Sequence, residues 1–92
     1  MKYKISKEAQ KDIENIWLYT FENLLVEQAD RYYNLILDEI EYLAQSPNSG
    51  KDYSHVRKGY YASKVNSHFI LYKIDSKEQE VEVIRVLHQQ MD

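Results

Sequence analysis

The chain has 92 residues, which is enough for one small domain with a single core. It contains no cysteine, which excludes disulfides and thiolate metal sites and fits a reducing compartment. Twelve Lys and Arg residues against fifteen Asp and Glu residues give a net charge of -3, which argues against direct binding of nucleic-acid phosphates. The first residues, MKYKIS, lack the apolar segment of a signal peptide, and no apolar run reaches membrane-spanning length, so we expect a soluble cytoplasmic protein.

The first half of the chain has the pattern of a short strand followed by two amphipathic helices. Residues 3–5 alternate as in a strand, and Ser6 then occupies a helix N-cap position. In both predicted helices apolar residues recur at steps of three and four. The first helix is predicted to end near 22–24, and the second carries its apolar stripe from 29 to 44. Their short connection predicts an antiparallel helical hairpin.

The second half of the chain has the pattern of strands. The turn residues SPNSG at 46–50 end the second helix. Strands are predicted at 60–65, 68–74 and 81–87, separated by Asn66–Ser67 and by the polar residues DSKEQE. The predicted order is strand, helix, helix, strand, strand, strand, without repeats or linkers.

Five segments carry a resemblance to a known family: AQKDIENIWLYT at 9–20, QADRYYNLI at 28–36, SPNSG at 46–50, HFILYKI at 68–74, and the ending VIRVLHQQMD. In this order and spacing they resemble the ParE toxins of the RelE/ParE superfamily, the toxic halves of bacterial type II toxin–antitoxin pairs. The resemblance implies a single α+β domain over residues 1–92. In that fold a short N-terminal strand and an antiparallel helical hairpin pack on an antiparallel sheet of about four strands.

The resemblance also implies a function and its partners. For the ParE branch it implies inhibition of DNA gyrase by binding and neutralisation by a ParD-like antitoxin in a hetero-oligomer. For the RelE branch it implies cleavage of messenger RNA in the ribosomal A site. A third possibility is a homologue that has lost toxicity and only binds its antitoxin. Since the two branches share one fold, the site has to distinguish them.

A ribonuclease needs an acid/base group and cations directed at the phosphate. By the resemblance, Phe69 occupies the position of the phosphate-binding arginine of RelE-like enzymes, and the preceding strand offers only Lys64. The ribonuclease alternative would use His88 as acid/base, with Lys64 and Arg85 on phosphate. We favour instead a His88 that hydrogen-bonds the sheet edge or the tail. We therefore predict no catalytic residue, no metal and no cofactor, and a toxin that acts by binding.

Arg85 is ambiguous in the sequence. Strict alternation would place it with Val81, Val83 and Leu87 on one face of the last strand, where it interrupts an apolar row. An unpaired buried charge is costly, so Arg85 either pairs with an acid on the helices or anchors a carboxylate of a partner. The sequence leaves both alternatives open.

Aromatic and arginine side chains dominate protein interfaces, and they supply the candidate contact residues. We expect an antitoxin segment to fold against the outer part of the hairpin and against the sheet face near Tyr61. The candidates for binding antitoxin or target are Trp17, Phe21, Tyr61, Arg85 and His88. For Trp17, core packing is the favoured alternative. His55 and His68 have no partner at a recognisable ligand spacing and are interpreted as ordinary polar residues.

Overall fold

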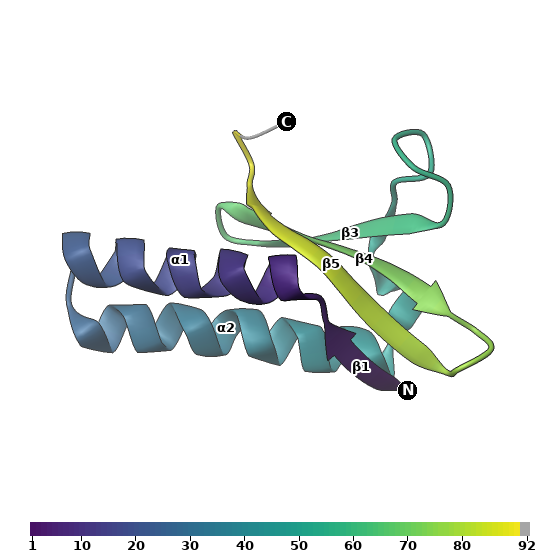
Figure 1. Cartoon of the computed structure of the whole chain (residues 1–92), viewed down its shortest axis with the longest axis horizontal. Helices are drawn as coiled ribbons and strands as arrows, with labels where there is room; N and C mark the ends of the chain where they lie inside the picture. The colour runs from purple at the N-terminus through teal and green to yellow at the C-terminus, as the bar shows by residue number, and fades with distance from the viewer. Residues whose placement is uncertain (91–92) are drawn as a thin grey trace.

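Two antiparallel helices cover one face of a five-stranded sheet in the computed structural model, which describes residues 1–90 (Figure 1). The helices are α1 (Lys7–Asn23) and α2 (Val26–Gln45), followed by the 3-10 turn η1 (Pro47–Ser49). The strands are β1 (Lys2–Ile5), β2 (Lys51–Asp52), β3 (Tyr60–Val65), β4 (His68–Asp75) and β5 (Glu80–His88). The predicted α+β class and the predicted order of helices and long strands are confirmed.

The sheet is larger than expected and is mixed rather than antiparallel. Its order is β1-β5-β4-β3-β2, with β1 parallel to β5 and the other pairs antiparallel. The fifth strand, β2, has only two residues, which is too short for an alternating pattern in the sequence to reveal it. β1 lies at one edge of the sheet, far in sequence from its neighbour β5, and its direction is set by that pairing.

Ser6 fixes the start of α1 against the last strand. Its hydroxyl accepts the N–H of Ala9 at 3.0 Å, as an N-cap does, and donates to the carbonyl of Ile84 at 2.8 Å. Its backbone N–H donates to the carbonyl of Val83 at 3.0 Å. The first turns of α1 therefore lie along the edge of β5 beyond the point where β1 ends.

The core lies between α2 and the middle of the sheet. Seven large side chains are fully buried there: Ile36, Ile40, Leu43, Ile70, Tyr72, Val81 and Val83. The Tyr72 hydroxyl donates to the carbonyl of Pro47 at 2.7 Å and accepts the N–H of Gly50 at 3.1 Å. These bonds satisfy the one polar atom of the buried ring and tie the end of the helical hairpin to the sheet.

A bulge in β5 changes which residues face the helices. Leu71 pairs with Arg85, whereas the next residue, Tyr72, pairs with Val83, so Ile84 is the extra residue. The expected grouping of Arg85 and Leu87 with Val81 and Val83 is therefore wrong. Beyond the bulge, Val86 is the residue buried against the helices. Arg85 no longer shares a face with Val81 and Val83, and it lies beside α1.

Neither helix within residues 1–90 combines the length and the apolar composition that crossing a membrane requires.

Candidate functional site

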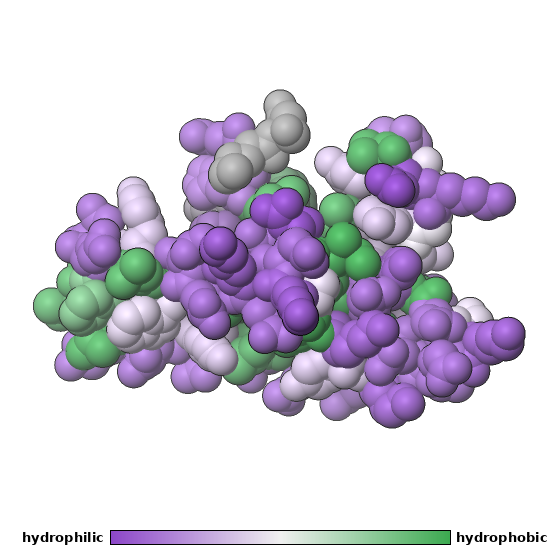
Figure 2. Space-filling model, viewed as in Figure 1, coloured by the Kyte–Doolittle hydropathy of each residue, from purple (hydrophilic) through white to green (hydrophobic). Residues whose placement is uncertain are grey.

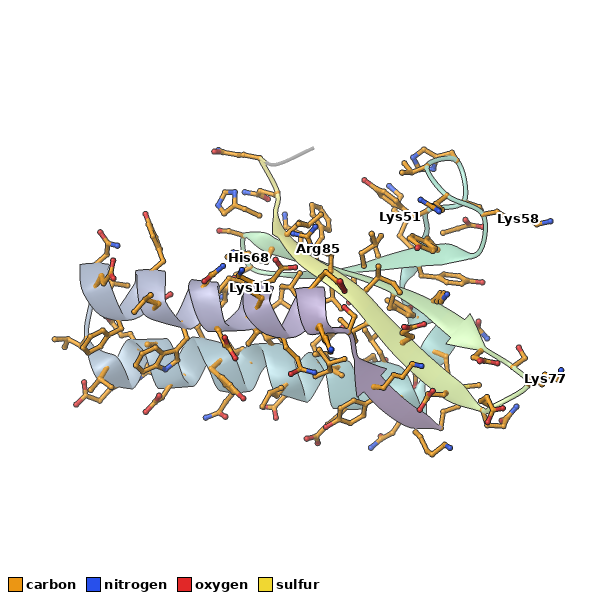
Figure 3. The ribbon with its side chains drawn as sticks, viewed as in Figure 1. Lys11, Lys51, Lys58, His68, Lys77 and Arg85 are labelled. Atoms are coloured by element: carbon orange, nitrogen blue, oxygen red, sulfur yellow. The ribbon has the colours of Figure 1, made fainter. Side chains whose placement is uncertain are left out.

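Arg85 is held by an acid on the first helix. Its Nε donates to Oδ2 of Asp12 at 2.7 Å and its Nη2 donates to Oδ1 at 3.0 Å. The same Oδ2 accepts the backbone N–H of Val86 at 2.9 Å. Figure 3 shows Arg85 reaching from β5 over the first half of α1. Of the two alternatives for Arg85, the internal ion pair is the one observed, and these bonds raise the pKa of Arg85.

The far end of the helical hairpin projects beyond the sheet (Figure 1). Six large apolar residues there are each at least 42% exposed: Leu18, Tyr19, Phe21, Leu24, Leu25 and Val26. We call these six residues the hairpin tip. Hydrophobic residues gather at this end of the hairpin, at the left of Figure 2. The charged residues within segment 18–28 are Glu22 and Glu27, both acidic. A clustered apolar surface of this kind is characteristic of a protein-binding site.

Trp17 and Phe21 connect the hairpin tip to the rest of the hairpin. Their rings stack with centroids 5.2 Å apart and an interplanar angle of 10°. The indole Nε1 of Trp17 donates to Oδ1 of Asp30 on α2 at 2.9 Å. Trp17 is half-buried and Phe21 is 45% exposed. Trp17 therefore braces the two helices, whereas Phe21 is available to a partner.

The sheet face opposite the helices carries an apolar row between cations. Ala62 pairs with Leu71, and Phe69 pairs with Leu87, across β3, β4 and β5. With Tyr53 and Val56 from the β2–β3 loop these residues surround a hollow of about 270 Å³. We call this the open sheet face.

The cations of the open sheet face follow from the strand register. Lys64 pairs with Phe69 and is exposed, and Lys51 pairs with Ala62. Since residues directly opposite one another share a face, both lysines border the apolar row. The guanidinium of Arg57 lies 5.9 Å from the centroid of the Tyr60 ring. Lys51 and Lys58 lie at the β2–β3 loop end of the sheet, away from the helices (Figure 3).

Tyr61 does not lie beside Arg85. Its ring stacks on Tyr72, with centroids 5.6 Å apart at 24°, and packs at the border of the core. As the neighbour of Ala62 on β3, Tyr61 points to the helix-covered face. Tyr61 and Arg85, both candidates for contacting a partner, therefore do not share one surface of the sheet.

His88 lies at a cleft between the helical hairpin and the end of the β4–β5 pair. It is directly opposite His68, and the two imidazole centroids are 5.2 Å apart with an interplanar angle of 86°. The cleft has a volume of about 640 Å³ and is also lined by Tyr32 and Gln28 of α2 and by Ile16 of α1. The N–H of Gln90 donates to Nδ1 of His88 at 3.1 Å, so the predicted hydrogen bond between His88 and the tail is present.

His68 and Tyr32 are members of this cluster that the sequence did not single out. The Tyr32 hydroxyl lies 2.5 Å from Nδ1 of His68 and donates to the carbonyl of Val65 at 3.1 Å. Burial, and then the neighbouring His88, lower the pKa of His68. The sequence does place one histidine at the start of β4 and one at the end of β5. Predicting that they meet would have required knowing the register between these two strands.

Lys64, Arg85 and His88 do not converge. Lys64 shares a row with Phe69 and Leu87, and His88 occupies the next row with His68, so Lys64 and His88 point to opposite faces of the sheet. Arg85 is bound to Asp12. Among residues 1–90 there is also no group of three or more His, Cys, Asp or Glu side chains placed to hold a metal.

Comparison with known proteins assigns the family. Residues 3–92 match the sequence model of the ParE toxin of type II toxin–antitoxin system, parDE. The chain belongs to the ParE toxin family. The resemblance seen in the sequence, and with it the assignment to toxins of type II toxin–antitoxin systems, is confirmed.

Two curated relatives of this ParE-family chain are named Toxin ParE1. The protein from Caulobacter vibrioides is 36% identical over 90 residues, which cover 98% of this chain and 91% of that protein. The protein from Mycobacterium tuberculosis is 34% identical over 91 residues, which cover 99% and 92%. Both alignments span the helical hairpin and the sheet.

Three solved structures share the fold of this ParE-family chain. The chromosomal ParDE system of P. aeruginosa has a TM-score of 0.82 at 17% identity, covering 96% of this chain and 95% of that one. The toxin–antitoxin complex RelBE2 of Mycobacterium tuberculosis has 0.74 at 18% identity, covering 95% of both chains. The YoeB/ParE toxin of Agrobacterium tumefaciens has 0.73 at 22% identity, covering 96% and 98%. The fold is thus common to proteins named for different branches of the superfamily.

Proposed function

We propose that this protein is a ParE toxin that inhibits DNA gyrase in the cytoplasm by binding it, and that a ParD-like antitoxin neutralises it. The observation that carries the binding mechanism is the separation of Lys64, Arg85 and His88. Cleavage of RNA passes through a phosphorane with extra negative charge, which requires an acid/base group and cations directed at one point. By the resemblance, Phe69 stands where RelE-like ribonucleases have a phosphate-binding arginine, and Arg85 is bound to Asp12, so the cations do not converge on one point.

The open sheet face is the surface we assign to the antitoxin. An apolar row bordered by Lys51 and Lys64 is complementary to an acidic amphipathic segment, whose apolar side chains would fill the hollow near Phe69. Two of the structurally similar proteins, the ParDE system and RelBE2, come from toxin–antitoxin assemblies. Family membership and surface chemistry together support an antitoxin partner of this kind.

We assign the hairpin tip to the target, although the sequence led us to expect an antitoxin contact on the outer hairpin. The tip is apolar, the charged residues within its segment are the acids Glu22 and Glu27, and it projects at the opposite end of the molecule from the β2–β3 loop (Figures 1 and 2). Phe21, exposed and stacked on Trp17, supplies the kind of aromatic contact that dominates interfaces. This assignment predicts a target surface that combines an apolar groove with basic residues.

The test compares two activities of the purified protein. A gyrase supercoiling assay is set beside primer extension on translated messages, with His88→Ala as the variant. The proposal predicts inhibition of supercoiling by both proteins and no message cleavage by either. Message cleavage that His88→Ala abolishes would establish the ribonuclease alternative. Induced expression that leaves growth unchanged would favour a homologue without toxicity.

A further inference from the structure

The cross-strand pair His68 and His88 has features of a metal-binding site that the proposed function does not use. The first residue of β4 and the last residue of β5 are direct register partners, so their side chains project from the sheet together. Both imidazoles line the cleft described above. Figure 3 shows His68 near the middle of the molecule, at the level of α1.

The hydrogen bonds of Tyr32 determine which nitrogen of His68 is free. The Tyr32 hydroxyl lies 3.1 Å from the carbonyl of Val65 and 2.5 Å from Nδ1 of His68, and its one proton can serve only one of them. When it donates to Val65, the contact with His68 is a hydrogen bond from Nδ1–H, and Nε2 of His68 keeps its lone pair. The site proposed below uses this tautomer. A histidine ligand typically has its second nitrogen fixed in this way by an outer partner.

His88 can offer the same atom with a small rearrangement. Its Nδ1 accepts the N–H of Gln90, which places the proton of the neutral ring on Nε2. Transfer of that proton to Nδ1 would free Nε2 and would cost the single hydrogen bond to Gln90. Since Gln90 is exposed, its N–H can be hydrated instead. Within residues 1–90 neither Nε2 atom has a hydrogen-bond partner.

The spacing of the two rings fits a shared ion. Two imidazoles bound to one tetrahedral Zn²⁺ at Zn–N distances of about 2.0–2.1 Å have ring centroids about 5 Å apart. The observed separation of the centroids is 5.2 Å. The separation of the rings is therefore compatible with a common ion, as it is with the edge-to-face packing of the two imidazoles.

The cleft is electrically neutral and has room for further ligands. Its lining contains no Lys, Arg, Asp or Glu among the described residues. It contains amide and hydroxyl oxygens, from Asn15, Gln28, Asn66 and Ser67. A volume of about 640 Å³ leaves space for water on the metal.

We propose that His68 and His88 bind one late first-row divalent transition-metal ion through their Nε2 atoms, with water in the remaining coordination positions. Imidazole ligands select Zn²⁺, Ni²⁺ and Cu²⁺ over Mg²⁺ and Ca²⁺. Tyr32 is a positioning residue for this site, because its hydroxyl contacts Nδ1 of His68 and holds the ring in place. The bound ion links the beginning of β4 to the end of β5 and stabilises the folded chain by mass action. This inference does not depend on gyrase being the target.

The experiment is a ZnCl₂ titration of the untagged chain by calorimetry, with unfolding temperature as a second readout. The proposal predicts one Zn²⁺ per chain, loss of binding in His68→Ala and His88→Ala, and unchanged binding in His55→Ala, which removes an exposed histidine elsewhere. Tyr32→Phe is expected to weaken binding about tenfold. Side-chain nitrogen NMR of the metal-free protein should show Nδ1–H on His68.

Other results would overturn the proposal. Zn²⁺ binding that survives both alanine variants, or that His55→Ala abolishes, would place the ion elsewhere. Absence of binding at millimolar Zn²⁺ would refute the site outright. If an alanine variant fails to fold by circular dichroism, His68→Gln and His88→Gln replace it, since glutamine retains polar bulk without the imidazole. Mg²⁺ serves as the ion control and should not bind.

Discussion

Asp12 on α1 and Arg85 on β5 are 73 residues apart and form a two-bond ion pair. The same carboxylate accepts the N–H of Val86, which the edge of the sheet would otherwise leave unpaired. One acidic side chain therefore attaches the first helix to the last strand, just past the bulge at Ile84. The arrangement explains how an arginine is accommodated next to an apolar row.

The Asp12 carboxylate should matter more for stability than the Arg85 guanidinium. Asp12→Ala removes an acceptor used by both Arg85 and the Val86 N–H, and we expect it to lower the free energy of unfolding by about 1–3 kcal/mol. Arg85→Ala should cost less, because Asp12 still accepts the Val86 N–H and the Arg85 side chain is 41% exposed. Urea denaturation followed by circular dichroism measures both. Equal losses, or a larger loss for Arg85→Ala, would contradict this account.

Gly50 is required by the buried ring of Tyr72. A Cβ at this position would overlap the Tyr72 hydroxyl and come within 2.9 Å of its ring carbons. Gly50→Ala should therefore destabilise the protein by about 1–3 kcal/mol through overpacking, measured as a lower midpoint of urea denaturation. Gly59→Ala is the control, since a Cβ there meets nothing within 4 Å and the only cost is its positive φ of 83°. We expect Gly59→Ala to lose about 1–2 kcal/mol from the backbone alone, without a steric clash.

Periodicity was enough to predict the helices and the three long strands, because their buried residues recur at fixed steps. It could not reveal the bulge at Ile84, where one extra residue without a glycine shifts the phase of β5. The apolar stripe of the first helix also continues in the sequence to Leu24, yet Leu24 is 58% exposed. The hairpin extends past the sheet, so the end of that stripe has nothing to pack against (Figure 1).

The candidate sites depend on contacts that linear spacing does not encode. His68 and His88 meet only through the β4–β5 register, and Asp12 meets Arg85 only because α1 lies along the edge of β5. The choice between an ion pair and a partner contact for Arg85 was therefore open from the sequence. The absence of a cation at Phe69, in contrast, was visible in the sequence itself.

Tyr72 should make the protein sensitive to alkaline pH. Burial raises the pKa of Tyr72 above its ordinary value of 10.0; the hydrogen bond from the N–H of Gly50 lowers it in part, and Tyr61 and Glu39 raise it. The unfolded chain therefore releases this proton first as pH rises, so the stability contributed by the neutral phenol is complete below pH 10 and is lost above it. The free energy of unfolding should fall as the pH rises above about 10 in the parent and fall less in Tyr72→Phe.

The control for this titration is Tyr42→Phe, which removes a half-exposed hydroxyl on α2. Tyr72→Phe also loses the hydrogen bonds to Pro47 and Gly50, so its stability is lower at every pH, and only the slope against pH is diagnostic. Parallel curves for the parent and Tyr72→Phe would mean that another group is responsible for alkaline sensitivity.

The two proposed interaction surfaces can be separated by charge changes. Lys64→Glu on the open sheet face should weaken binding of a ParD-like antitoxin by about tenfold and reduce its dependence on salt, because an acidic partner segment then meets a like charge. Lys77→Glu, at the β4–β5 turn away from this face (Figure 3), is the matched control and should leave the affinity unchanged. Calorimetry or surface plasmon resonance at two salt concentrations measures both variants.

Leu25→Lys at the hairpin tip should have the opposite profile. Leu25 is 65% exposed, so the substitution should change the free energy of unfolding by about 0.5 kcal/mol or less. It places a cation in the apolar, acidic surface assigned to the target, and should relieve growth inhibition on induced expression while antitoxin affinity is retained. Full toxicity in Leu25→Lys, or loss of antitoxin binding in this variant with Lys64→Glu unaffected, would show that the two surfaces have been assigned to the wrong partners.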